Sequence, residues 1–190
     1  MQGRAEMRTP ELAGAEPIES PEWLRRFADR YGEAWNSHDA DAVGACMAED
    51  VVFQDPTLST PARGRDEVMA FAVETFNGFP DVNVERTQDL TISEDRLRAF
   101  APWRMTGTNT GPVDPPGFAP TGRSFDIEGV GLWSFRGGLL WRYRDLYDTA
   151  DLARQLGLLP PRGGAGEKLM VRMQRLRAGL ARRGPTRRGP

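Results

Sequence analysis

Residues 139–148 read LLWRYRDLYD, and this stretch decides the fold. Side chains on a strand alternate between two faces, so a period of two separates the residues into two sets. One set is apolar or aromatic apart from a single carboxylate: Leu139, Trp141, Tyr143, Asp145 and Tyr147. The other set contains two arginines and is expected to face water. The pattern therefore predicts a strand that carries a carboxylate towards a core.

Asp145 is open to two interpretations. A carboxylate in an apolar interior is costly unless it is paired, hydrogen-bonded or protonated. Burial raises its pKa, and a raised carboxylate pKa suits proton transfer near neutral pH. The alternative is a structural acid bonded to Arg142, Arg144 or backbone amides, because perturbed acids also occur in structural networks.

The totals describe one soluble domain. The chain has 190 residues, of which 39% are hydrophobic, and it has no apolar run near the roughly 20 residues of a membrane helix. Its first residues lack the apolar centre of a secretory signal. A single cysteine, Cys46, excludes an internal disulfide and favours a reducing, cytoplasmic location.

Composition also bounds the cofactors and partners. One histidine and one cysteine argue against a zinc site, although a cation held only by carboxylates stays open. The last thirty residues hold nine of the 25 basic residues and one of the 27 acidic residues, which leaves residues 1–160 with a formal charge of −10. An acidic body does not suit nucleic acid, so only the tail stays a candidate for an anionic partner.

The N-terminal part is expected to be helical. Residues 1–20 are polar and predicted to be disordered. Ser20-Pro21-Glu22 has the composition of a helix start, and an aromatic residue then recurs every fourth position on one face: Trp23, Phe27, Tyr31 and Trp35. Tyr31 should therefore point inward, where its hydroxyl needs a partner. Two further helices are predicted, a short one from Asp39 to Met47 and another over residues 64–77.

Asp55 is the second carboxylate of interest. It ends a short strand, Val51–Pro56, in phase with Val51 and Phe53. It is either an inward-facing acid or a turn residue that makes local hydrogen bonds before Pro56.

After Pro80 the periodicity changes to that of strands. A break is expected near Arg86, and Pro102 implies an edge position or a bulge. The long loop over residues 107–123 has one large apolar residue, Phe118, and is typical of a lid. Gly129 and Gly131 fall in the inward phase of the next strand, where they indicate either a sheet bend or space for a ligand.

The C-terminal part should end the domain near residue 160. A short helix is predicted over residues 150–156, and residues 161–190 form a basic tail that is expected to be disordered. The alternative for the tail is a basic amphipathic helix that carries Leu169, Met173, Leu176 and Leu180.

Helices first and antiparallel strands later predict an α+β fold over residues 21–160. A curved mixed or antiparallel sheet would wrap on the N-terminal helices and form a cone-shaped α+β barrel with an apolar pocket.

Four segments carry a resemblance to a known family. RYGEAWNSHDADAV, AEDVVFQDP, PTGRSFDIEGVGLWSFRGG and YDTADLARQLGLLP resemble the nuclear transport factor 2-like superfamily, and within it the SnoaL-like polyketide cyclase group. The likeness covers about residues 22–160 and implies the cone-shaped fold and a homodimer, but it does not specify the reaction.

Three enzyme types of the superfamily imply different site residues. Ketosteroid isomerase implies Tyr31 as oxyanion donor and Asp55 as general base, but its second oxyanion acid falls near Gly131. SnoaL-like cyclases imply Asp145 as acid and base, and their histidine partner also falls near Gly131. Limonene epoxide hydrolase has a run similar to residues 144–148.

That hydrolase has an Arg–Asp pair on its middle strand, and in this chain only the arginine has a counterpart, Arg104. Its two water-holding residues correspond to Phe53 and Asp55. No template fits completely.

The sequence thus predicts a metal- and cofactor-free acid–base enzyme that cyclises or isomerises a polyketide-like or terpenoid-like compound of secondary metabolism. Asp145 would shuttle a proton, Asp55 would be a second acid or base, and Tyr31 would donate to an oxyanion. The expected substrate-binding residues are mostly aromatic: Phe53, Trp103, Arg104, Phe118, Trp133, Trp141 and Tyr143. An epoxide hydrolase and a non-catalytic ligand-binding or assembly protein are the alternatives.

Overall fold

The structure is a computed structural model that describes residues 12–113 and 117–181. The disorder expected for residues 1–11 lies outside this range. Residues 12–20 were also expected to be disordered, but they pack on the domain. Ile18 is 1% exposed, and the backbone N–H of Glu16 donates to the carbonyl of Phe135. The buried side chain of Ile18 holds this segment against the core. The sequence did not predict this, because the other residues of the segment are mostly polar.

The first helix, α1, spans Pro21–Asn36 and starts where the sequence predicted. The Ser20 hydroxyl accepts a hydrogen bond from the Trp23 N–H and so caps the helix start. Its inward face buries Leu24, Phe27, Tyr31, Ala34 and Trp35. The predicted inward position of Tyr31 is confirmed.

The next elements complete the helical layer and begin the sheet. Helix α2 spans Ala40–Gly44, strand β1 spans Met47–Gln54, strand β2 spans Ala62–Arg63, and helix α3 spans Arg65–Gly78. The short helix ends three residues before its predicted end because β1 starts at Met47 and pairs there with Leu140.

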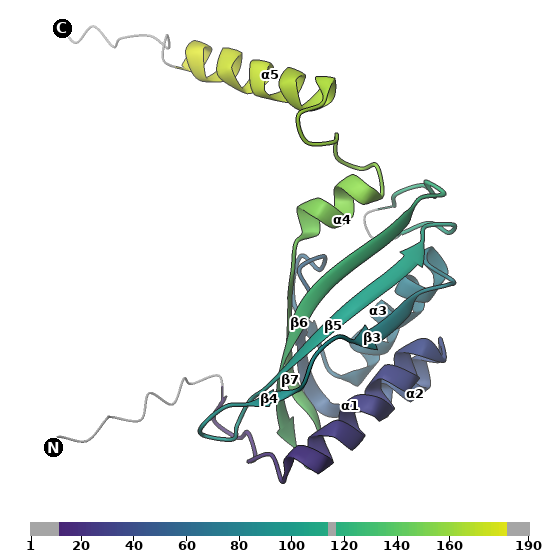
Figure 1. Cartoon of the computed structure of the whole chain (residues 1–190), viewed down its shortest axis with the longest axis vertical. Helices are drawn as coiled ribbons and strands as arrows, with labels where there is room; N and C mark the ends of the chain where they lie inside the picture. Colours follow the sequence, from purple (N-terminus) through teal and green to yellow (C-terminus); the bar gives the residue numbers. More distant parts are fainter. Residues whose placement is uncertain (1–11, 114–116, 182–190) are drawn as a thin grey trace, which may run out of the picture.

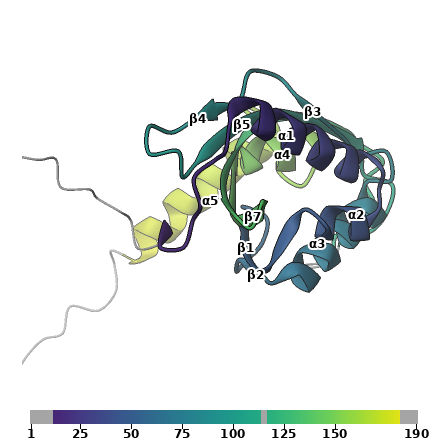
Figure 2. The same ribbon diagram turned by 90° about the horizontal axis from the view of Figure 1, so that it is seen from below.

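Five further strands follow: β3 (Asn83–Arg86), β4 (Thr91–Ile92), β5 (Ala99–Thr108), β6 (Ser124–Arg136) and β7 (Leu139–Tyr147). The sheet order is β2-β1-β7-β6-β5-β3, with β4 also paired to β5. Strands β1 and β7 are parallel, and all other pairs are antiparallel. The predicted α+β class with a curved mixed sheet is confirmed, and the sheet does not close (Figure 2). Helices α1, α2 and α3 lie across its concave side (Figures 1 and 2).

Pro102 lies opposite a break in the neighbouring strand. On that side, residues 99–100 of β5 pair with β4, and residues 103–106 pair with β3. The Pro102 carbonyl accepts from the Thr87 N–H in the intervening segment. Pro102 has no N–H and cannot donate a hydrogen bond to a neighbouring strand. The gap between β3 and β4 lies opposite this residue, where that hydrogen bond would be missing.

A bulge in β7 overturns one predicted position. The β6–β7 register shifts between Ser134, which pairs with Arg142, and Phe135, which pairs with Leu140. Leu140 therefore joins the core, although a strict period of two placed it outside. Trp141 is the extra residue, and the guanidinium groups of Arg136 and Arg142 both lie over its ring.

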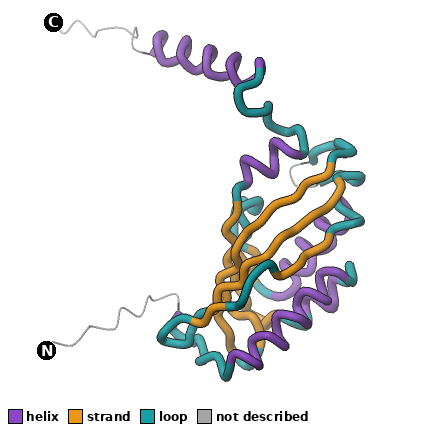
Figure 3. The backbone as a smooth tube through the Cα atoms, viewed as in Figure 1, coloured by secondary structure: helices purple, strands orange, loops and turns teal. Residues whose placement is uncertain are grey.

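The chain ends with two helices, α4 (Thr149–Gln155) and α5 (Ala165–Ala181). Residues 165–181 are therefore helical rather than disordered as the sequence favoured, and α5 extends away from the sheet (Figures 1 and 3). Several of its apolar side chains are exposed: Leu169, Met170, Val171, Met173 and Leu176. Within the described residues, no helix has the length and apolarity to cross a membrane.

Candidate active site

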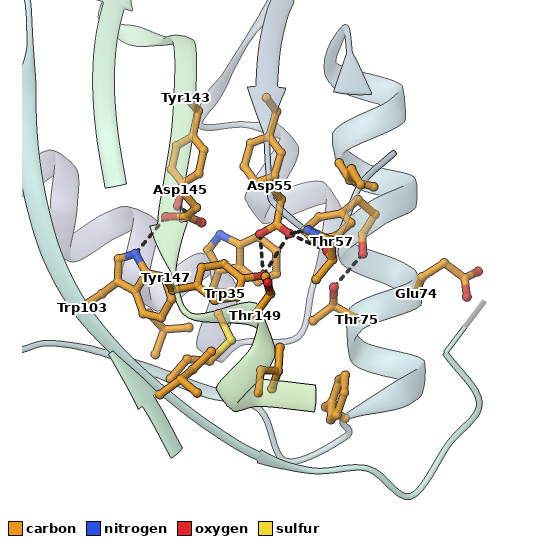
Figure 4. A pocket seen from close by; sticks show the side chains of 18 of the residues that line it. Trp35, Asp55, Thr57, Glu74, Thr75, Trp103, Tyr143, Asp145, Tyr147 and Thr149 are labelled. Carbon is orange, nitrogen blue, oxygen red and sulfur yellow. Dashed lines mark hydrogen bonds between the residues drawn. The ribbon is translucent and has the colours of Figure 1, made fainter. Parts of the chain in front are cut away.

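A cavity of about 900 Å³ lies between the concave face of the sheet and helices α1 and α3. Its wall is mainly apolar and aromatic, with contributions from all the long strands and from α4. A few polar side chains face into it, among them Asp55, Thr57, Thr75, Asp145 and Tyr147 (Figure 4). A large apolar pocket with a few convergent polar groups is the usual form of a small-molecule site.

Asp145 lies in this wall and is 7% exposed. Its Oδ1 accepts a hydrogen bond from Trp103 Nε1 at 2.9 Å, and its Oδ2 accepts one from the Tyr143 hydroxyl at 2.7 Å (Figure 4). Burial, and next the charge of Asp55, raise the pKa of Asp145 to about 8. The two donors favour the ionised form and oppose this rise. Asp145 is thus a carboxyl group that can change protonation state near neutral pH.

The two inward glycines of β6 accommodate indole rings. A Cβ on Gly129 would lie 2.4 Å from Trp103 Cζ2, and a Cβ on Gly131 would lie 2.4 Å from Trp133 Nε1. Gly131 pairs with Asp145 across the sheet. The missing side-chain volume at these two positions therefore lets the indole rings of Trp103 and Trp133 lie close to the backbone of β6.

Asp55 satisfies both of the interpretations that the sequence left open. Its Oδ1 accepts from the Thr57 N–H at 2.7 Å, which is a local turn interaction. The same carboxylate accepts from the Tyr147 hydroxyl at 3.0 Å and lines the cavity (Figure 4). Burial raises the pKa of Tyr147, so this hydroxyl stays protonated and keeps donating to Asp55.

Two residues that line the cavity each carry a buried donor atom without a partner within the described residues: Tyr31 Oη and Trp133 Nε1. Tyr31 is 6% exposed and Trp133 is 5% exposed. Leaving a buried donor unsatisfied typically costs about 1–3 kcal/mol. Burial raises the pKa of Tyr31, so its hydroxyl stays protonated.

The structure brings together most of the residues that the sequence selected. Eight of them line the cavity: Tyr31, Phe53, Asp55, Trp103, Phe118, Trp133, Tyr143 and Asp145. Phe118 is the most accessible of the eight, with 44% exposure, and the neighbouring residues 114–116 of the proposed lid lie outside the described range.

Two predicted residues lie elsewhere. Arg104 falls in the outward phase of β5 and forms ion pairs with Asp126 and Glu85, so its assignment to substrate binding is corrected. Trp141 is moved out of the cavity wall by the bulge, and its Nε1 donates to Asp50 instead.

Sequence reasoning missed Tyr147 and Thr57 as partners of Asp55. Tyr147 shares the inward phase of Asp145 in residues 139–148, so a signal was present. Its pairing with Asp55 depends on the parallel contact between β1 and β7, which no local pattern encodes.

The described residues contain no cluster of three or more histidine, cysteine or acidic side chains that could hold a metal ion. The two cavity carboxylates, Asp55 and Asp145, are instead held by hydroxyl and N–H donors from the protein.

Comparison with known proteins places residues 25–156 in a family model described as SnoaL-like polyketide cyclase. The chain is similar in structure to TsrD from Streptomyces laurentii, with 21% identity, a TM-score of 0.62, and coverage of 74% of this chain and 98% of TsrD. It is also similar to a protein with a ketosteroid isomerase-like fold from Catenulispora acidiphila, solved with trimethylamine, with 18% identity, a TM-score of 0.57, and coverage of 69% and 92%. These likenesses show a shared fold. No curated protein matches the sequence.

Proposed function

Because the chain belongs to the SnoaL-like polyketide cyclase family, we propose that it catalyses an acid–base cyclisation or isomerisation of a hydrophobic carbonyl compound. The observation that carries the proposal is Asp145, a buried carboxyl group in an apolar cavity with a pKa of about 8. A general base works best when its pKa lies near the operating pH.

The cavity supports a polyketide-like or terpenoid-like substrate. Its volume of about 900 Å³ accommodates a molecule of drug-like size, and its aromatic wall suits flat, conjugated rings. Asp145 and Asp55, with the hydroxyls of Tyr143 and Tyr147 bonded to them, would orient the reacting end of such a molecule.

The proposed reaction needs one group to take and return a proton. Ionised Asp145 removes a proton from a carbon next to a carbonyl, and the C–H electron pair forms an enolate. The enolate carbon attacks a second carbonyl carbon of the same molecule, which forms the ring bond and an alkoxide. Protonated Asp145 then gives its proton to the alkoxide. The product is an isomer of the substrate, so no oxidant, reductant or further reactant is needed.

Asp55 is assigned two roles in this proposal. Its negative charge contributes to the raised pKa of Asp145. Its carboxylate also reaches the cavity beside Tyr147 and is a second acceptor for a substrate proton.

Epoxide opening is the second candidate, favoured by one observation. Asp145 reaches the cavity from β7 and Asp55 from the segment just after β1, so one carboxyl group can activate water while the other protonates the leaving oxygen.

The decisive experiment compares Asp145→Asn and Asp55→Asn with wild type on a panel of polyketide-type ketoesters, ketones and epoxides. Asp126→Asn is the matched control, because Asp126 lies on the outer face and pairs with Arg104. We expect Asp145→Asn to lose about 10²–10⁴ in kcat/KM and the control to retain wild-type activity.

The pH profile supplies an independent test. Because the ionised form starts the reaction, kcat/KM of wild type should rise with pH and level off above about 8. Asp55→Asn removes a negative charge near Asp145, so the midpoint should move to lower pH. Equal rates in wild type and Asp145→Asn would leave a non-catalytic binding protein as the better description.

A further inference from the structure

Helix α5 extends away from the sheet and leaves its apolar side chains in solvent (Figure 1). Every residue from 168 to 177 is exposed, and Leu169, Met173 and Leu176 are each more than half exposed. In proteins, most of the stability of a helix comes from packing an amphipathic face rather than from intrinsic propensity. The exposed face of α5 therefore indicates a partner outside the domain.

The apolar and basic side chains of α5 form neighbouring stripes. Leu169, Met173 and Leu176 follow one another at steps of four and three residues, which places them on one face of the helix, here called the apolar stripe. Basic side chains lie on both sides of this stripe: Lys168, Arg172 and Arg175 on one side and Arg177 on the other. Long basic side chains in such positions can rest on an apolar layer and still reach a polar, charged surface.

The positive charge of α5 is nearly uncompensated. The helix has four basic residues and one acidic residue, Glu167, which lies in the first turn, where its Oε2 accepts from the Gly163 N–H at 2.5 Å. Residues 1–160, by contrast, carry a formal charge of −10. Two such basic helices would repel each other, so charge disfavours pairing with α5 of a second copy and favours an anionic partner.

We propose that α5 binds the surface of a membrane that contains anionic lipids. The apolar stripe would enter the boundary between headgroups and acyl chains, and the basic side chains would contact the lipid phosphates. A nucleic acid would satisfy the arginines but leave the apolar stripe in water. The helix would lie on the membrane, since no helix of the described residues is long and apolar enough to cross one.

The connection between the domain and α5 is compatible with this placement. Residues 160–164 read PPRGG, and Gly163 has a φ of +71°. Glycine adopts many backbone conformations, so the helix can change direction relative to the domain. An anionic surface repels the acidic domain, which would stay on the water side. This inference goes beyond the proposed function and does not depend on Asp145.

Vesicle flotation of the full chain tests the proposal. The chain should bind vesicles of phosphatidylcholine and phosphatidylserine, bind vesicles of phosphatidylcholine alone much more weakly, and dissociate as salt is added. Arg172→Gln combined with Arg175→Gln should weaken binding by on the order of 10- to 30-fold, because each basic residue near an anionic surface contributes about fivefold. A chain without residues 162–190 should not bind.

A matched pair of variants tests the apolar stripe. Leu169→Gln combined with Leu176→Gln should weaken binding by on the order of 10- to 100-fold, because two apolar side chains no longer enter the lipid. Met170→Gln combined with Val171→Gln removes two exposed apolar side chains outside the stripe and should bind nearly as wild type does. Glutamine is a good helix former, and thermal melts confirm that each variant is folded.

Several outcomes would overturn the membrane site. They are equal binding to both kinds of vesicle, equal binding by the stripe variant and its matched control, and tighter binding to duplex DNA than to anionic vesicles. Self-association of the full chain without lipid, if lost in the stripe variant, would instead identify a second copy as the partner. None of these variants changes a cavity residue, so turnover without lipid should stay at the wild-type level and tests the proposed function separately.

Discussion

Asp145 links stability to pH through its raised pKa. In the unfolded chain an aspartate has its ordinary pKa near 3.8, whereas in the folded protein the pKa of Asp145 is about 8. Between these values the folded state binds more protons than the unfolded state, so the free energy of unfolding falls as pH rises. The slope from this one group is about 1.4 kcal/mol per pH unit.

We therefore expect Asp145→Asn to be less sensitive to pH than wild type between about pH 4 and 8, and more stable than wild type at pH 9. Asparagine keeps an acceptor for Trp103 and offers a donor to the Tyr143 oxygen, so the local geometry should survive. Urea unfolding at several pH values measures the difference.

Asp126→Asn is the control for this measurement too. A hydrogen bond from Arg104 lowers the pKa of Asp126, so ionisation of Asp126 affects stability only at acid pH. Parallel stability curves for wild type and Asp145→Asn from pH 4 to 8 would contradict the raised pKa.

At this scale the sequence located the acid but not its partners. The period of two in residues 139–148 was sufficient to turn Asp145 inward. The donor from Trp103 comes from 42 residues away, and it depends on the close approach of the indole ring to Gly129. The sequence indicated free space at Gly129. That the Trp103 ring fills this space depends on the tertiary packing and cannot be predicted from local sequence.

Strand β6 depends on its glycines, and the same substitution should have opposite effects in two elements. Gly129→Ala places a methyl group 2.4 Å from the Trp103 ring, so overpacking should cost about 1–3 kcal/mol of stability. Gly32→Ala in the middle of α1 meets nothing within 4 Å and should stabilise the protein by about 0.5–1 kcal/mol. Denaturant unfolding gives both values, and two changes of the same sign would refute the argument.

The error at Trp141 shows what limits prediction at the scale of elements. A period of two assumes an unbroken ladder, and the bulge in β7 shifts every residue before it to the other face. Nothing in LLWRYRDLYD marks the bulge, because Leu140 and Trp141 are both apolar. The start and the inward face of α1 were predicted correctly, because its cap and its aromatic spacing agree.

At the scale of the molecule, α5 is expected to be dispensable for folding. It leads away from the sheet, and its apolar residues are exposed (Figure 1). Removal of residues 162–190 should leave the thermal midpoint within about 2 °C of wild type. Removal from Thr149 onward is the contrasting variant, because it deletes buried Leu156 and the Gln155 hydrogen bonds to Asp126, and it should lower the midpoint clearly.

Oligomeric state is a property of this scale that stays a prediction. The resemblance implies a homodimer, and sedimentation velocity of the intact chain measures it directly. A monomer at micromolar concentration would contradict the implied state.

The parallel contact between β1 and β7 has a consequence for how the protein is made. Among the described residues, the only strand partner of β1 besides the two-residue β2 is β7, about ninety residues further along the chain. On the ribosome, the first strand therefore emerges long before the strand that completes it. Until β7 has left the exit tunnel, the nascent chain exposes the unpaired edge of β1 and the hydrophobic side of the helices. Chaperones can bind these surfaces during that time.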